Sequence, residues 1–296
     1  MALKDVKMKI AGVRKTKQIT KAMNMVSSAK LRGAQQRIER FSPYADKFRE
    51  MLLDLSAQSD AGAHPLLEVR AEPKKTGIIL VTSDRGLCGS YNASLIQTAL
   101  KLGREKAREG REVTFYCAGR KGRDAVRKQN LKNGWDPILT GSYDFTLAAS
   151  MGEHLIRAFL DGELDEVFLV NAKFVSVARQ VPMTVQLLPI APPKNGGQGA
   201  PGEERKESSF KNYLYEPDAI SLLAELLPRY LKVQTYRALL DNSASEHAAR
   251  MAAMDNATRN CDEIVNSLTL LYNKTRQGSI TTELIDIVSG AGALEG

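Results

Sequence analysis

The sequence predicts an α/β fold, in which a Rossmann-like α/β domain is inserted between two long terminal helices that form an antiparallel coiled coil. Three observations predict it: apolar residues at helical spacing near both termini, alternating strand and helix patterns in the middle, and a polar linker before the last helix. The predicted boundaries are 1–58 for the N-terminal helix, 74–191 for the α/β domain, 192–209 for the linker and 210–296 for the C-terminal helix.

The C-terminal helix gives the clearest signal. No glycine occurs between Gly202 and Gly278, and no proline follows Pro228. Alternating spacings of three and four residues are typical of a coiled-coil seam. The stripe consists of Leu223, Leu226, Tyr230, Val233, Arg237, Leu240, Ala244, His247, Met251, Met254, Thr258, Cys261, Val265, Leu268 and Tyr272. A seam of this length needs a partner helix.

The N-terminal helix supplies a matching stripe, with one interruption. Its apolar members are Val6, Ile10, Val13, Leu31, Ala34, Ile38, Phe41, Ala45, Phe48, Leu52 and Leu55. In between, the stripe meets the polar residues Lys17, Thr20, Asn24 and Ser27, while apolar character moves to Ile19, Ala22, Met23, Val26 and Ala29. We therefore predict a phase slip that changes the local winding of the supercoil. The stripe continues in phase past Pro43, which predicts a kink in one continuous helix.

The two seams allow two arrangements. They can pair antiparallel within one chain, or each can pair with its own copy in a parallel homodimer. We favour the first arrangement, because both seams lie in one chain and close without a second molecule.

The middle of the chain alternates between strand and helix patterns. The predicted strands are 76–82, 113–118, 166–177 and 181–190, and the predicted helices are 90–109, 120–129 and 144–160. Asp144 is a suitable N-cap for the last of these helices. Pro182 makes the last strand an edge strand, because proline cannot donate to a neighbouring strand. This alternation is typical of a Rossmann-like sheet.

No catalytic motif accompanies the α/β pattern. The sequence contains neither the GxxxxGK[ST] nor the GxGxxG phosphate-binding motif after the first predicted strand, and neither GxSxG nor HExxH. The stretch SDRGLCGSYN, from Ser83 to Asn92, has glycines without phosphate-cradle spacing, so we interpret it as a tight strand-to-helix turn. Cys88, Cys117 and Cys261 are far apart, and we expect three buried small side chains rather than a metal site or a disulfide framework. We expect no cofactor.

Charge is concentrated near the N-terminus. The net charge is +8, and residues 1–40 contain eleven Lys or Arg but only two acids, Asp5 and Glu39. Such a helix either faces a negatively charged partner or presents a solvated surface. Its continuing seam indicates mature structure rather than a targeting presequence. No run of 18 apolar residues occurs, so we expect no direct membrane span.

Three stretches resemble signature segments of the gamma subunit of rotary F-type ATP synthase. They are IAGVRKTKQITKAMNMVSSAKLRGAQ (Ile10–Gln35), SDRGLCGSYN, and RQGSITTELIDIVSGAGAL (Arg276–Leu294). The resemblance implies a non-catalytic central-stalk rotor that couples rotation of a proton-driven membrane c-ring to conformational changes at catalytic sites on the beta subunits. It implies contacts with the alpha and beta subunits of the catalytic ring, the epsilon subunit and the c-ring, and none with nucleic acid. The implied location is peripheral, on the cytoplasmic face of the bacterial inner membrane.

The resemblance also implies two sets of interface residues. The first faces acidic loops of the beta subunits, and the second turns inside an apolar sleeve. These sets are Lys21, Met23, Lys30 and Arg32, and Leu284, Ile285, Ile287 and Val288. The alternatives are a solvated basic face and a last stretch of ordinary seam. The predicted phase slip would shape the asymmetry of the rotor, and Gly278 would weaken its last helix by about 1 kcal/mol relative to alanine.

Two other functions compete with the rotor. A nucleic-acid-binding protein with a basic coiled-coil arm is the first, and it predicts binding that weakens steeply with salt. An enzyme with an α/β nucleotide domain is the second, and it predicts nucleotide binding by residues 74–191.

Overall fold

The structure, a computed structural model, describes residues 3–57, 64–135, 143–190 and 219–295. The predicted linker, 192–209, lies outside the described residues, as do the side chains of residues 290–295. The chain divides into two compact units, one of Met1–Ala29 with Arg250–Gly296 and one of Lys30–Ala249. These units group residues by contact, whereas the domain boundaries predicted from the sequence follow the elements and stay predictions.

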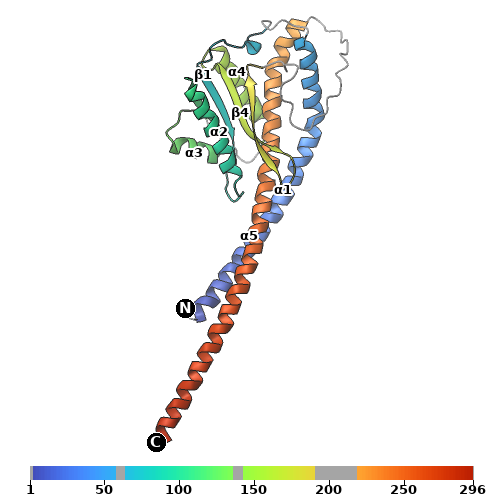
Figure 1. Cartoon of the computed structure of the whole chain (residues 1–296). Coiled ribbons are helices and arrows are strands. Elements are labelled where there is room, and N and C mark those ends of the chain that lie inside the picture. The colour runs from blue at the N-terminus through green and yellow to red at the C-terminus, as the bar shows by residue number, and fades with distance from the viewer. Residues whose placement is uncertain (1–2, 58–63, 136–142, 191–218, 296) are drawn as a thin grey trace. The chain divides into compact units, whose positions relative to one another are not determined.

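A five-stranded sheet organises the unit Lys30–Ala249 (Figure 1), in the order β3-β2-β1-β4-β5. The strands are β1 (Lys75–Val81), β2 (Glu112–Ala118), β3 (Asn133–Trp135), β4 (Glu166–Phe174) and β5 (Gln180–Leu188). Neighbouring strands run parallel, except that β5 is antiparallel to β4. The central position of β1 explains its continuous apolar run, because a strand covered on both faces has no polar side. Pro182 lies in β5, at the edge of the sheet, as predicted.

Helices cover both faces of this sheet. They are α2 (Tyr91–Arg108), α3 (Arg120–Lys128) and α4 (Phe145–Leu160). Leu95 of α2 and Val126 of α3 share a core with Ile78, whereas Leu155 of α4 shares another core with Ile79. Since successive strand residues point to opposite faces, α2 and α3 lie on one face and α4 on the other. The predicted Rossmann-like architecture is confirmed.

Local signals explain two of the boundaries. The Asp144 carboxylate accepts a hydrogen bond of 2.9 Å from the Leu147 N–H, which confirms the predicted N-cap of α4. Gly119 precedes α3 with φ +113°, and a Cβ there would lie 2.3 Å from the Thr82 carbonyl oxygen. Only glycine fits such a position. The sequence missed β3, which is three residues long and has no apolar alternation.

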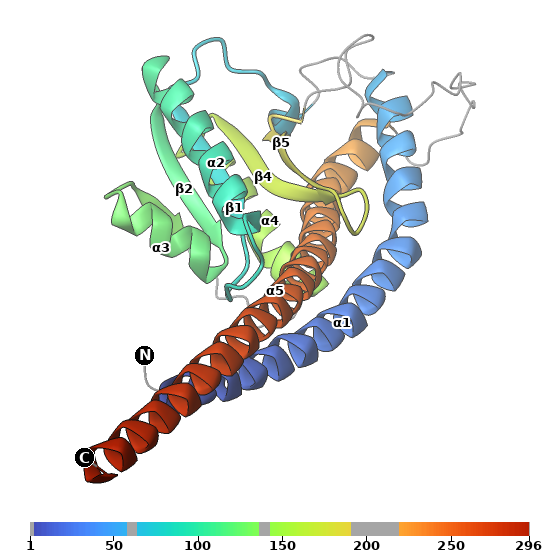
Figure 2. The same cartoon turned by 60° about the horizontal axis from the view of Figure 1, so that its bottom comes forward.

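The long helices α1 (Leu3–Ala57) and α5 (Ala219–Glu295) pair antiparallel within each unit. In Lys30–Ala249, the Arg237 guanidinium lies 2.6 Å from the Asp46 carboxylate, and the rings of Phe41 and Tyr236 lie 4.7 Å apart. Helix α1 continues through Pro43, as predicted. The intramolecular pairing is therefore confirmed, and Figure 2 gives a second view of α1 and α5.

Candidate functional site

Polar side chains hold the helix pair together in the unit of residues 1–29 and 250–296. We call these contacts the polar seam. They are an ion pair between Lys17 and Asp262, hydroxyl oxygens of Thr20 and Thr258 that lie 2.7 Å apart, and a 2.9 Å hydrogen bond from the Asn24 amide nitrogen to the Met251 carbonyl oxygen. Each of the three α1 residues occupies the position that the apolar stripe would have reached.

The predicted phase slip is therefore wrong. Thr20 and Ser27 are 8% and 3% exposed, whereas Ile19 and Val26, on the face to which the slip would move the seam, are 61% and 57% exposed. The physical reason is that short polar side chains satisfy one another across the seam, or bond to their own helix. Ser27 donates to the Met23 carbonyl oxygen at 2.8 Å. Burial of a hydroxyl with a hydrogen-bond partner costs little, so the seam stays in phase.

The predicted basic interface residues lie on the surface of α1. Lys21 belongs to the unit of residues 1–29 and 250–296, and Lys30 and Arg32 belong to the unit Lys30–Ala249; all three are exposed. Met23 is half-buried. Within the described part of the chain, none of the three cations forms an ion pair. Their role at an interface stays a prediction.

The other predicted interface lies near the end of α5. In Figure 1, this end runs past the N-terminus of α1. The residues concerned are Leu284, Ile285, Ile287 and Val288, which are 56%, 59%, 67% and 70% exposed. With Ile280, they cover roughly 160° of the helix surface at 3.6 residues per turn. Their role at an interface stays a prediction, like that of the basic residues. A Cβ added at Gly278 would meet no atom of another described segment within 4 Å, so packing does not require a glycine there.

The stretch Ser83–Asn92 forms the turn between β1 and α2. The Asn92 side chain accepts a 3.1 Å hydrogen bond from the Ser83 N–H and donates to the Cys88 sulfur at 3.2 Å. Leu87 has φ +63° and is 60% exposed, so the turn presents an apolar side chain outward. Cys88, Cys117 and Cys261 are all buried, as the sequence predicted.

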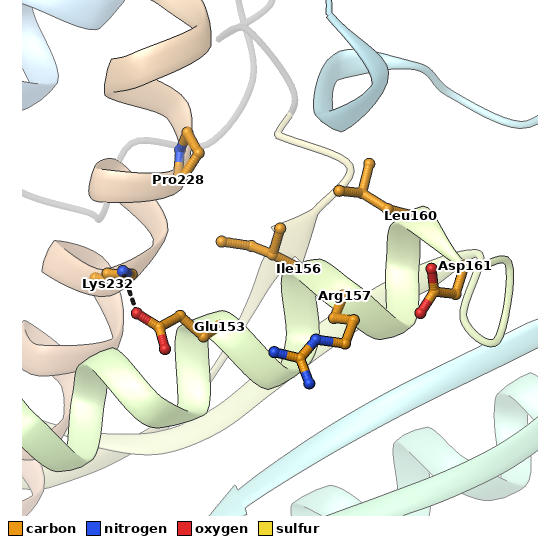
Figure 3. Close-up of a pocket in the computed structure, with 7 residues that line it drawn as sticks. All are labelled: Glu153, Ile156, Arg157, Leu160, Asp161, Pro228 and Lys232. Atoms are coloured by element: carbon orange, nitrogen blue, oxygen red, sulfur yellow. Dashed lines mark hydrogen bonds and ion pairs between the residues drawn. The ribbon is translucent and has the colours of Figure 1, made fainter.

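A cavity of about 360 Å³ lies between α4 and α5 (Figure 3). Its apolar part comes from Ile156, Leu160 and Pro228. Lys232 and Glu153 form an ion pair of 2.7 Å at its wall. The pair joins α4 to α5, Arg157 and Asp161 complete the polar part of the lining, and no sequence motif pointed to this cavity.

Comparisons with known proteins address the family directly. The family model described as ATP synthase matches residues 2–294. The ATP synthase gamma chain of Nitratidesulfovibrio vulgaris (strain Hildenborough) is 61% identical over 301 residues, covering 100% of this chain and 99% of its own. That of Lawsonia intracellularis is 52% identical, covering 99% of both chains. The chain belongs to the ATP synthase gamma-chain family. It is a gamma chain, a subunit of the ATP synthase complex.

Solved structures agree with this family at the level of the fold. A chain of the Euglena gracilis mitochondrial ATP synthase, in an OSCP/F1/c-ring structure, superposes with a TM-score of 0.65 at 20% identity, covering 99% of this chain and 94% of that chain. A chain from the central stalk and c-ring of the Tetrahymena thermophila enzyme gives 0.57 at 24% identity, covering 81% and 99%. Among the helices of the described residues, none is long and apolar enough to cross a membrane. Family membership decides against the nucleic-acid-binding and nucleotide-enzyme alternatives.

Proposed function

We propose that the helix pair of residues 1–29 and 250–296 turns within a ring of alpha and beta subunits. In this proposal, rotation of a proton-driven c-ring drives the shaft, and the shaft forces each beta subunit through its binding, synthesis and release conformations. The epsilon subunit and the c-ring contact the chain elsewhere. The observation that carries the proposal is the wide, exposed apolar surface at the end of α5, which continues beyond the polar seam.

The apolar end of α5 is suited to a bearing. Its members Ile280, Leu284, Ile285, Ile287 and Val288 are each about half exposed or more. Full burial of one such side chain contributes about 1.5–3 kcal/mol, so an apolar sleeve would hold this end strongly. Apolar contacts are non-directional, which allows the helix to turn inside such a sleeve without breaking specific bonds.

The basic residues are suited to transient contacts. Lys21, Lys30 and Arg32 are exposed. We propose that they meet acidic loops of successive beta subunits, with Met23 beside them. Exposed ion pairs contribute only about 0–1 kcal/mol each, so no single contact would trap the rotor. Complementary charge of this kind orients a partner and weakens with salt.

The polar seam keeps the two helices in register. A hydrogen bond or ion pair across a seam fixes one axial alignment, whereas aliphatic contacts tolerate sliding. Lys17, Thr20 and Asn24 would each lose a partner if α1 slipped along α5. The proposed result is a helix pair that turns as one body.

We propose the cytoplasmic face of a bacterial inner membrane as the place of assembly. The support is the high identity to bacterial gamma chains.

Reconstitution tests the proposal. The chain is mixed with alpha and beta subunits from the same source, and ATP hydrolysis is measured for the full chain and for a chain truncated after Gly278. The proposal predicts a stable complex whose hydrolysis depends on the full chain and whose assembly weakens on truncation. A Leu284→Ser/Ile287→Ser variant separates loss of the apolar surface from loss of the helix. If no complex forms and the chain instead binds nucleic acid in a salt-sensitive manner, the proposal is wrong.

A further inference from the structure

Helix α5 carries a buried polar stretch where a seam would need only a narrow apolar stripe. Asn242, Ser243, Ser245 and Glu246 are 0%, 1%, 0% and 7% exposed. The stretch belongs to the unit Lys30–Ala249. Buried polar groups are destabilising unless they form hydrogen bonds. Asn242, Ser245 and Glu246 find such partners on the surface that covers this helix, whereas among the described residues the Ser243 hydroxyl and the Asn242 amide nitrogen do not.

Two tyrosine hydroxyls meet this stretch. The Tyr91 hydroxyl donates to the Asn242 side-chain oxygen at 2.5 Å and lies 3.1 Å from the Asn242 carbonyl oxygen. The Tyr143 hydroxyl donates to the Glu246 carboxylate at 2.7 Å. Burial and the neighbouring Glu246 raise the pKa of Tyr143 well above its ordinary value, so the hydroxyl keeps the proton that it donates.

The two tyrosines come from opposite faces of the sheet. Tyr91 is the first residue of α2, directly after the turn that follows β1. Tyr143 lies two residues before α4, which covers the other face. Both helices begin at the carboxyl edge of the parallel strands. The Ser245 hydroxyl adds a contact at 3.5 Å to the carbonyl oxygen of Ala172, near the carboxyl end of β4.

This edge is where a sheet of this topology holds a ligand. From β1 the chain moves outward to β2 and β3, and then returns to β4 on the other side of β1. The strand order therefore reverses between β1 and β4. Open α/β sheets bind small molecules in the crevice at such a point, beyond the carboxyl ends of the strands.

We propose that α5 itself occupies this ligand position, and that Tyr91 and Tyr143 are positioning residues that fix the rotational setting of α5 against the sheet. The significance for coupling rests on the proposed function, since torque must pass between the α/β segment and α5. The assignment also gives a physical reason why this Rossmann-like segment has no phosphate motif: its crevice receives a helix.

The two tyrosine hydrogen bonds depend on direction, whereas the apolar contacts of the surrounding core do not. Leu239 and Ala238 pack α5 against the sheet, but apolar contacts do not specify an angle about the helix axis. Hydrogen bonds weaken steeply when their geometry changes. Asn242 and Glu246 are four residues apart and lie on one face of α5, so a rotation of the helix would disrupt both bonds together.

We call the hydrogen bonds from Tyr91 and Tyr143 to α5 the clamp, and spin-label distances test it without reference to activity. In the assembled complex, labels are placed at the exposed positions Arg104 of α2 and Arg229 of α5, after replacement of the three native cysteines. The Tyr91→Phe/Tyr143→Phe variant should give a broadened or shifted distance distribution. Tyr230→Phe is the matched control, because it also removes the hydroxyl of a largely buried tyrosine on α5 and should keep the parent distribution. An unchanged distribution in the double variant overturns the proposal.

Ion pumping per ATP hydrolysed tests the consequence. At a temperature where both complexes stay assembled, the double variant should pump several-fold fewer ions per ATP hydrolysed than the parent, because the two hydrogen bonds that fix the rotational setting of α5 are lost. Tyr230→Phe should keep the parent ratio. A double variant that couples as well as this control contradicts the positioning role. If the parent complex itself fails to couple pumping to hydrolysis, the proposed function is wrong, and the label distances still decide whether the clamp exists.

Discussion

The seam between α1 and α5 is mainly apolar in the unit Lys30–Ala249, whereas in the other unit polar pairs lie among buried apolar residues such as Val6 and Met254. In Lys30–Ala249, Leu31, Ala34 and Ala45 are buried on α1, and the sheet and α4 add a further layer over α5. In the unit of residues 1–29 and 250–296, Thr20 and Asn24 occupy equivalent seam positions. The difference shows that spacing, and not hydrophobicity, identifies the face along which two helices meet.

The largest expected effect lies in the apolar unit. Leu239 is fully buried in the core that α5 shares with α4 and the sheet. Leu239→Ala should lower the free energy of unfolding by about 2–5 kcal/mol, because it removes transfer free energy and leaves a cavity. Ile264→Ala, at a 46% exposed position of the other unit, should cost much less. Denaturant unfolding of the full chain checks both variants, and equal losses would contradict the difference in burial between the two positions.

The next effect depends on pH. Burial raises the pKa of Asp241 to about 6 from 3.8, although Arg237 and Lys173 partly oppose the shift. A carboxyl whose pKa rises on folding stabilises the folded state most below its unfolded pKa, and this contribution is lost as pH rises through about 6. Asp241→Asn should therefore be more stable than the parent above pH 6, by up to about 3 kcal/mol, and the difference should shrink towards pH 4. Unfolding measured across this range checks the sign, which would be reversed if Asp241 were held as a stabilised carboxylate.

The Thr20 and Thr258 hydroxyls test whether the polar seam contributes to stability. Thr20→Val should cost about 1 kcal/mol, because Thr258 loses its partner across the seam. Thr20→Val/Thr258→Val should recover much of this loss, since replacement of both partners leaves no hydroxyl without its cross-seam partner. Thr281→Val is a matched control, because its exposed hydroxyl bonds only to the Gln277 carbonyl oxygen of its own helix. A double-mutant cycle on unfolding free energies measures the coupling, and additive effects would mean that the two hydroxyls do not interact.

The smallest effect on stability is expected at the exposed end of α5. Leu284 is 56% exposed, so Leu284→Ser should change the free energy of unfolding of the isolated chain by no more than about 0.5 kcal/mol. Assembly with alpha and beta subunits should weaken clearly, because the proposed sleeve would lose an apolar contact. Denaturant unfolding measures the change in the free energy of unfolding, and a titration of complex formation measures the change in affinity for the alpha and beta subunits. A large loss of stability with unchanged assembly would place Leu284 in an internal contact instead.

Much of the fold could be predicted because its signals are local. The apolar run of β1, the Asp144 cap of α4 and the long stripe of α5 each depend on residues close together in the sequence. The short strand β3 could not be found, since its place comes from pairing with β2.

The polar seam and the clamp could not be predicted in this way, because they depend on contacts between residues far apart in the sequence. Lys17, Thr20 and Asn24 look like an interruption of an apolar pattern, because their partners Asp262, Thr258 and Met251 lie more than two hundred residues away. Tyr91 and Tyr143 likewise carry no motif. The one available signal was that Lys17, Thr20, Asn24 and Ser27 keep the three-and-four spacing of the stripe on either side. If the three-and-four spacing had been given more weight than the polarity of the side chains, the sequence would have predicted the polar seam.

Thiol labelling at two positions of α1 tests the in-phase polar seam most directly. Thr20→Cys and Val26→Cys are made separately in the full chain, with the three native cysteines replaced by alanine. The polar seam predicts that the cysteine at the 57% exposed position 26 reacts at least about tenfold faster than the cysteine at the 8% exposed position 20. Faster labelling at position 20 than at position 26 would show that the apolar face of Ile19 and Val26 packs against α5, and that the stripe of α1 does undergo the phase slip.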